Sequence, residues 1–168
     1  FGGTVDSIFS QGRASVNVTA GEISRISSSV SSSLVVSGGK IGSITSETGS
    51  VASIGGGEIG RLFQETGEVS ISGGTFSQDV VAIAGSLEIT GGVFRGSVYD
   101  DYLSDASIAI RGGEFKSEFR YNYNAFGNAS PFTFYGDLSI TKPVLVEGNR
   151  YESYITGVLQ GGDVISQK

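Results

Sequence analysis

The 168-residue sequence predicts an all-β fold, a right-handed parallel β-helix (β-solenoid) with coils of about 18 residues. Three observations predict it: a glycine doublet that recurs along the chain, three apolar positions that recur with it, and the alternation of apolar and polar residues typical of strands. Together these observations define a repeating unit of two short strands joined by turns.

The glycine doublet, once replaced by Ala-Gly, is followed by any residue and then by an apolar one. The seven copies read GGTVDSI, AGEISRI, GGKIGSI, GGEIGRL, GGTFSQD, GGVFRGS and GGEFKSE. Their apolar residues are spaced by 18, 18, 18, 17, 18 and 21 positions, and this first ladder consists of Val5, Ile23, Ile41, Ile59, Phe76, Phe94 and Phe115. A period of this length indicates a repeat architecture.

Two further apolar positions precede each following doublet and keep the same spacing of 18, 18, 17, 18 and 21 residues. The second ladder consists of Val18, Val36, Ile54, Ile71, Ile89 and Ile110. The third ladder consists of Val16, Leu34, Ala52, Val69, Leu87 and Ile108. Stacking the coils roughly 4.8 Å apart would bury all three ladders and pair every strand with the coils on either side. The doublets then occupy corners, where glycine accepts positive φ.

The same stacking places charged residues next to one another. Glu22, Lys40 and Glu58 would be neighbours on successive coils, with charges that alternate in sign as cross-strand pairs prefer. A left-handed β-helix needs an apolar residue at every sixth position, which the chain lacks. An antiparallel meander of hairpins remains an alternative at this point. Right-handed winding is expected because connections between parallel strands almost always have that hand.

The pattern changes from the fifth copy onward. The first ladder becomes Phe, and the apolar residue that followed three positions later now follows after four. We interpret this shift as a bulge or a wider coil. The affected polar and apolar residues are Asp79 and Val80, Ser97 and Val98, and Glu118 and Phe119.

The sequence is interpreted as one domain, 1–168, with regular coils over 1–119 and irregular coils or a C-terminal cap over 120–168. Insertions enlarge the sixth and seventh coils, at 99–105 and 120–128, and start at the same offset from their doublets. Insertions at one offset emerge on one face of a solenoid. The later segments YGDLSI, PVLVEG and YITGVLQGGDVI are still typical of strands, and the last keeps Leu159 and Val164 around its doublet.

The composition excludes several function classes. The chain has no Cys and no His, which excludes disulfides, thiol nucleophiles, His-based triads and ordinary zinc sites. A net charge of −6 opposes binding to nucleic acid or to an anionic membrane. No apolar run is long enough for membrane insertion. Because the chain starts at Phe1 without Met, we expect it to be part of a longer chain with neighbouring domains.

The segments VSISGGTFSQDV and SLEITGGVFRG resemble the I-x-G-G-x-F repeats of right-handed β-helix segments in surface proteins of gut and host-associated bacteria. The resemblance covers residues 1 to about 120 and extends to the pectate-lyase-like superfamily. It implies an extracellular, cell-surface location and a stalk or ligand-presenting role. That superfamily also includes polysaccharide lyases and hydrolases, but no catalytic motif of those enzymes is matched, so no functional residue is carried over.

The two insertions supply the candidate binding site. They combine aromatic faces, carboxylates and amides, which recognise sugars or a protein partner. The structural alternative is that the tyrosines cover the enlarged coils and the acids solvate a loop. The acidic residues lack the spacing of an EF-hand, so no metal and no cofactor are expected. The candidates are Tyr99, Asp100, Asp101, Tyr102, Asp105, Arg120, Tyr121, Asn122, Tyr123 and Asn124.

The sequence therefore favours a non-catalytic extracellular module, a stalk or adhesin-like segment of a larger bacterial surface protein. Its expected partner is a glycan or a host or surface protein. The second hypothesis is a carbohydrate-active β-helix, lyase-like or hydrolase-like, or a glycan-binding module. A cleft in which carboxylates converge with a basic residue would favour that second hypothesis.

Overall fold

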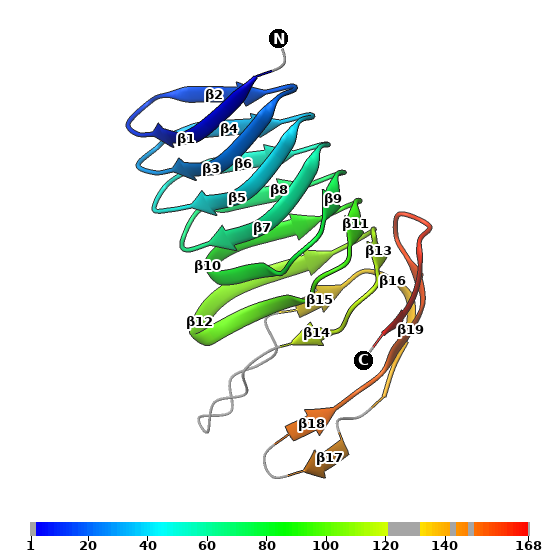
Figure 1. The fold of residues 1–168 in the computed structure, drawn as a ribbon. Coiled ribbons are helices and arrows are strands. Elements are labelled where there is room, and N and C mark those ends of the chain that lie inside the picture. The colour runs from blue at the N-terminus through cyan, green and yellow to red at the C-terminus, as the bar shows by residue number, and fades with distance from the viewer. Residues whose placement is uncertain (1–2, 121–131, 142–143, 148–149, 168) are drawn as a thin grey trace.

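The computed structural model describes residues 3–120, 132–141, 144–147 and 150–167. These residues form a parallel β-solenoid of about six turns (Figure 1). Among them there is no helix with the length and hydropathy of a membrane span. From the N-terminus downward, the chain in Figure 1 runs leftward along the front strands and rightward along the back strands, which is a right-handed winding.

Two parallel sheets form the first four coils. The front strands are β1 (Thr4–Ser10), β3 (Glu22–Ser28), β5 (Lys40–Ser46) and β7 (Glu58–Gln64). The back strands are β2 (Ser15–Val18), β4 (Ser33–Val36), β6 (Val51–Ile54) and β8 (Glu68–Ile71). Every pairing within them is parallel, which excludes the antiparallel meander for this part of the chain.

The later coils divide the front strand into two pieces. Short strands continue the first ladder, and long strands run from the front sheet into the back sheet. The short strands are β9 (Thr75–Phe76), β11 (Val93–Phe94) and β13 (Glu114–Phe115), and the long ones are β10 (Val80–Ile89) and β12 (Val98–Ile110). The seventh coil contributes β14 (Phe119–Arg120) and β15 (Phe132–Phe134), which both pair with β12.

The registers confirm all three predicted ladders. In the first ladder, Ile59 pairs with Ile41 on one side and with Phe76 on the other, and it is 1% exposed. The second and third ladders pair position by position from β2 to β12. The second glycine of each corner doublet from coil two onward has a φ between +87° and +115°, as a corner requires.

The predicted shift of one residue is also confirmed. Val80 pairs with Leu62 and with Val98, and Val98 pairs with Phe119, although the spacing from the first ladder has grown from three to four residues. The added residue sits at Asp79, where β9 has ended and β10 has not begun. It widens the coil where phenylalanine enters the first ladder.

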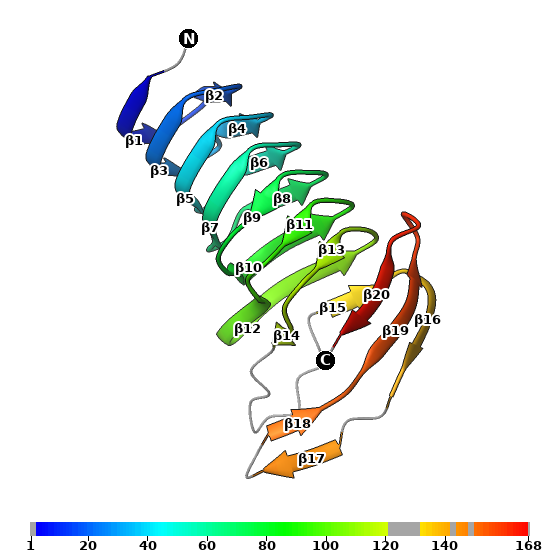
Figure 2. The same cartoon turned by 45° about the vertical axis from the view of Figure 1, so that its right-hand side comes forward.

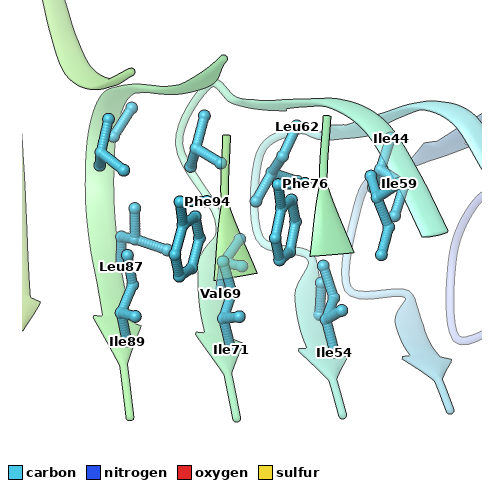
Figure 3. Packing of buried hydrophobic residues seen from close by; sticks show 14 of the residues in the cluster. Ile44, Ile54, Ile59, Leu62, Val69, Ile71, Phe76, Leu87, Ile89 and Phe94 are labelled. Atoms are coloured by element: carbon cyan, nitrogen blue, oxygen red, sulfur yellow. The ribbon is translucent and has the colours of Figure 1, made fainter. Parts of the chain in front are cut away.

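Phenylalanine rings fill the wider coils. The rings of Phe76 and Phe94 stack with centroids 4.9 Å apart, and those of Phe94 and Phe115 with centroids 4.8 Å apart. Figure 3 shows the rings of Phe76 and Phe94 side by side within the cluster of buried apolar side chains, with Leu87 next to Phe94. Because the ring separation equals the separation of paired strands, the phenylalanines stack without disturbing the backbone register.

The turn of the fourth coil, which is one residue shorter than that of the third, is stabilised by different side-chain hydrogen bonds. In the third coil, the buried hydroxyls of Ser46 and Ser50 hydrogen bond across the turn at 2.8 Å. In the fourth coil, Gln64 takes the place of the first serine, and its Nε2 donates to the carbonyl oxygens of Gly67 at 2.7 Å and Ser86 at 2.9 Å. A Cβ at Gly67 would lie 2.5 Å from the Ser46 hydroxyl, so the shorter turn needs glycine there.

An antiparallel cap covers the C-terminal end of the solenoid (Figure 2). It consists of β16 (Gly136–Ile140), β19 (Ile155–Leu159) and β20 (Val164–Gln167), with a separate hairpin of β17 (Val144–Glu147) and β18 (Arg150–Glu152). The cap adds three buried apolar side chains to the solenoid core: Ile155, Leu159 and Ile165.

The cap shows that one of the two interpretations of the C-terminal segment is wrong. The last glycine doublet is not the corner of a coil. Val158 and Val164 pair in antiparallel register, so Gly161 and Gly162 lie in a hairpin turn. Leu159 is buried as expected, but Val164 is 76% exposed. A doublet followed by an apolar residue suits both kinds of turn, because both need glycine at positive φ.

Arg111 connects the cap to the solenoid. Its guanidinium lies 3.6 Å from the ring centroid of Tyr135, pairs with Glu88 at 2.9 Å and donates to the side chain of Gln160 at 2.9 Å. The backbone of the same residue accepts a hydrogen bond from Gly161 at 2.6 Å. The side chain therefore joins the back strands β10 and β12 to Tyr135 and Gln160, which are neighbours at one end of the cap.

Replacing Arg111 with Ala is expected to lower the free energy of unfolding by about 1–2 kcal/mol, because the cation–π contact and a partly exposed ion pair are lost together. Chemical denaturation measures the change. Lys116→Ala is the control, since Lys116 pairs with Glu114 at the surface and its side chain is 57% exposed. Equal effects of the two substitutions would contradict the proposed role of Arg111.

Candidate functional site

The two insertions start side by side, as expected from their common offset. Tyr99 in β12 pairs with Val81 in β10 and with Arg120 in β14. The pairing of β10 and β12 then jumps from Ala82 with Asp100 to Ala84 with Asp105. Residues 101–104 of β12 therefore lie opposite the single residue Ile83 of β10, which accounts for the three extra residues of the sixth coil.

The predicted binding residues differ in their surroundings. Tyr99 is half-buried, and Asp100 is buried with 6% of its surface exposed. Arg120 is exposed and pairs with Glu118, whose Oε1 accepts from the arginine Nε at 2.7 Å. Of these three residues, only Arg120 is exposed.

The structure describes the remaining candidate residues less fully. Asp101 and Tyr102 lie in β12, but their side chains are not among those described, and Asp105 at the end of the insertion is exposed. Residues 121–131, which include Tyr121, Asn122, Tyr123 and Asn124, lie outside the described residues. In the part of the chain that the structure describes, no group of three or more acidic residues is placed to hold a metal ion.

A groove along the solenoid axis, with both polar and apolar surface, was not anticipated from the sequence. This axial groove has a volume of about 470 Å³ and crosses β3, β5 and β7 on the outside of the coils. Its lining comes from two positions of the repeat, one on each side of the first ladder. The lining residues are Thr4, Glu22, Ser24, Lys40, Gly42, Glu58, Gly60, Thr75, Ser77 and Arg95, together with Ile23, Ile41 and Ile59 of the first ladder.

Two glycines leave part of the groove without side chains. Gly42 and Gly60 directly follow the first ladder, at the position that the paired register of the front strands skips. A Cβ on Gly42 would lie 2.5 Å from the carbonyl oxygen of Ser24, and one on Gly60 would lie 2.1 Å from that of Gly42. Contacts this short with backbone are not allowed, so close stacking on the preceding coil excludes side chains at Gly42 and Gly60.

Charges of both signs line one wall of the groove. Glu22 pairs in register with Lys40, and Lys40 with Glu58, so the predicted alternation is confirmed. All three side chains are exposed. Thr75 continues this wall, and Arg95 contributes a second cation on the C-terminal side.

The alternating charges were visible in the sequence, but the groove was not. A repeat identifies which residues share a face, whereas the depth of that face depends on the missing side chains at Gly42 and Gly60. Glycine inside a strand is a known sign of close backbone approach and was the one available signal.

Comparisons with known proteins do not identify a family. No protein-family model matches the chain, and neither the search of curated proteins nor the search of solved structures gives a match. The β-solenoid fold is therefore established from the repeat and its registers, and the function has to be argued from the surface.

Proposed function

We propose that the chain is a non-catalytic structural or binding module, an adhesin-like stalk segment of a larger extracellular protein. The observation that carries this proposal is the uninterrupted first ladder, buried from Ile23 to Phe115. Each coil is held by its neighbours through parallel strand pairing and a shared core, so the solenoid is a rigid rod. A rigid rod suits the spacing or presentation of a binding surface.

The binding surface that we assign to this rod is the axial groove, and its ligand is a neutral glycan. Hydroxyl groups of a sugar accept from Lys40 and Arg95, donate to Glu22 and Glu58, and do both with Thr75. A chain of sugars laid along the axis would meet one hydrogen-bonding side chain of this wall at each coil, roughly every 4.8 Å.

Other linear ligands fit this groove less well. A uniformly charged polymer would meet a like charge at every second coil, because Glu22, Lys40 and Glu58 alternate. An extended peptide would cross the strands and not lie beside them, and so would lose the main-chain pairing from which strand addition gains affinity. A neutral ligand rich in hydroxyl groups avoids both penalties.

The test is a screen of neutral and charged glycans against the whole chain, followed by calorimetry on any ligand found. Lys40→Ala and Glu58→Ala are expected to weaken binding at least about tenfold, since each removes charge-assisted hydrogen bonds. Glu68→Ala is the matched control, because Glu68 is an exposed glutamate on β8 in the back sheet. Tyr99→Ala tests the insertion face in the same assay.

Two results would contradict this assignment. Binding that is unchanged in Lys40→Ala and Glu58→Ala but lost in Tyr99→Ala would move the site to the insertions. If no glycan binds, the assignment of the axial groove as a glycan-binding site is wrong, and only the stalk role remains proposed.

One observation favours a second function, that of a carbohydrate-active β-helix. Glu22 and Glu58 flank Lys40, and their strands lie two coil steps apart, roughly 10 Å. That spacing is near the upper end for a pair of carboxylates in an inverting glycosidase. Their exposure favours binding over catalysis, because a catalytic acid works in a desolvated setting. Release of oligosaccharides that is abolished by Glu58→Gln would establish the enzymatic function.

A further inference from the structure

The charges along the axial groove are unevenly distributed. In the second to fourth coils two carboxylates flank one ammonium group, so this stretch of the groove carries a net charge of −1. In the fifth and sixth coils the lining side chains are those of Thr75, Ser77 and Arg95, so this stretch carries a net charge of +1. The groove is therefore acidic toward its N-terminal end and basic toward its C-terminal end.

Arg95 differs from Lys40 in its neighbours. Lys40 lies between two glutamates of the adjacent coils. The position of Arg95 is occupied by Ser77 on the preceding coil and by Lys116 on the following coil, and Lys116 already pairs with Glu114. Within the residues that the structure describes, no ion pair joins Arg95 to a carboxylate. The exposed guanidinium at this end of the groove can therefore bind a negative group of a ligand.

We propose that the groove binds a glycan that is neutral along its length and ends in an acidic sugar, whose carboxylate lies against Arg95. This inference rests on the glycan-binding function proposed above and adds the chemistry of one end of the ligand. A guanidinium holds a carboxylate through two parallel charge-assisted hydrogen bonds, which are stronger and more directional than hydrogen bonds between neutral groups. The hydroxyl groups of Thr75 and Ser77 supply hydrogen bonds to the same sugar.

The acidic stretch of the groove determines the direction of the glycan. A carboxylate placed between Glu22 and Glu58 would be repelled by both side chains, whereas a carboxylate at Arg95 is attracted. The backbones at Glu58 and Arg95 are two coil steps apart, roughly 10 Å, and the Debye length is about 8 Å at physiological ionic strength. The glutamates therefore do not cancel the positive charge of Arg95, and the acidic end of the glycan points toward the C-terminal cap.

Calorimetry on the whole chain with matched oligosaccharides tests the inference. Cellotetraose, maltotetraose and xylotetraose are each used in two forms that differ only at the terminal carbon. In the aldonic acid this carbon is oxidised to a carboxylate, and in the alditol it is reduced and carries no charge. At least one aldonic acid is expected to bind about tenfold more tightly than its alditol, and this preference is expected to shrink as the salt concentration rises.

Arg95→Gln is expected to remove the preference for the aldonic acid, because the charge and the two-pronged geometry are both lost. Arg61→Gln is the matched control. Arg61 is also an exposed arginine, but it lies outside the groove lining, and its guanidinium is 5.5 Å from the ring centroid of Phe63. Lys40→Ala is expected to weaken the binding of both forms alike and to leave the preference unchanged.

The possible results separate this inference from the proposed function. Equal affinities for the aldonic acids and the alditols, or a preference that Arg95→Gln leaves intact, would overturn the inference while the groove remains a glycan site. A preference lost equally in Arg61→Gln would also overturn it, because the effect would then reflect only the net charge of the protein. Failure of both forms of all the oligosaccharides to bind would count against the inference and the glycan-binding function together.

Discussion

Replacing Ile59 with Asp is expected to lower the free energy of unfolding by about 4 kcal/mol or more, which is a large part of the stability of a domain of this size. Ile59 lies in the middle of the first ladder, between Ile41 and Phe76, and is 1% exposed. A carboxylate at this position would have no partner in the apolar stack, and the contacts of the isoleucine would be lost as well.

Thermal unfolding followed by circular dichroism measures this effect. Ser53→Asp is the control, because Ser53 lies on β6 with its side chain exposed and the substitution introduces the same charge. The control is expected to unfold at nearly the wild-type temperature. A midpoint for Ile59→Asp within about two degrees of wild type would contradict the register of the ladder.

Gly85→Ala is expected to have the second largest effect, a loss of about 2–4 kcal/mol. Gly85 lies in β10 with a φ of +82°, where an L-residue is strained, and a Cβ there would lie 2.2 Å from the carbonyl oxygen of Gly67 in the preceding coil. The carbonyl oxygen of Gly67 accepts hydrogen bonds from the backbone of Ser86 and from Gln64 Nε2, and Gly85 is paired with β12, so the coils would have to move apart.

Substitutions at two other glycines separate the two causes of this loss of stability, which are backbone strain and steric overlap. Gly12 has a φ of +63° but nothing within 4 Å of its Cβ position, so Gly12→Ala reports the backbone strain alone, about 1 kcal/mol. Gly3 has neither a positive φ nor a close neighbour, and Gly3→Ala is expected to be neutral. Equal losses in Gly85→Ala and Gly12→Ala, measured by chemical denaturation, would show that the stacking of coils tolerates the extra methyl group.

The repeat is sufficient to predict most of the solenoid. A residue that recurs every coil has the same neighbours in every coil, so spacing alone assigns Ile59 to the core and to both of its partners. The one-residue shift at Val80 follows in the same way. Periodicity is informative here because each coil contacts only the coils next to it.

Where the repeat ends, the residue pattern is compatible with two arrangements. Val164 follows a glycine doublet as a ladder residue would, but it lies in an antiparallel hairpin and is exposed. A single hairpin has no second copy against which its pattern can be compared. The form of the cap depends instead on what can cover the end of the core, and Leu159 and Ile165 do so.

For the candidate sites, too, the spacing of residues predicts one part and only the tertiary structure decides the other. Coil offset alone predicts that Tyr99 and Arg120 start neighbouring insertions and that Glu22, Lys40 and Glu58 share a face. The burial of Asp100 and the concave shape of the charged face emerge only in three dimensions. Burial and concavity depend on where the side chains of paired residues lie in space, and a one-dimensional spacing does not contain those positions.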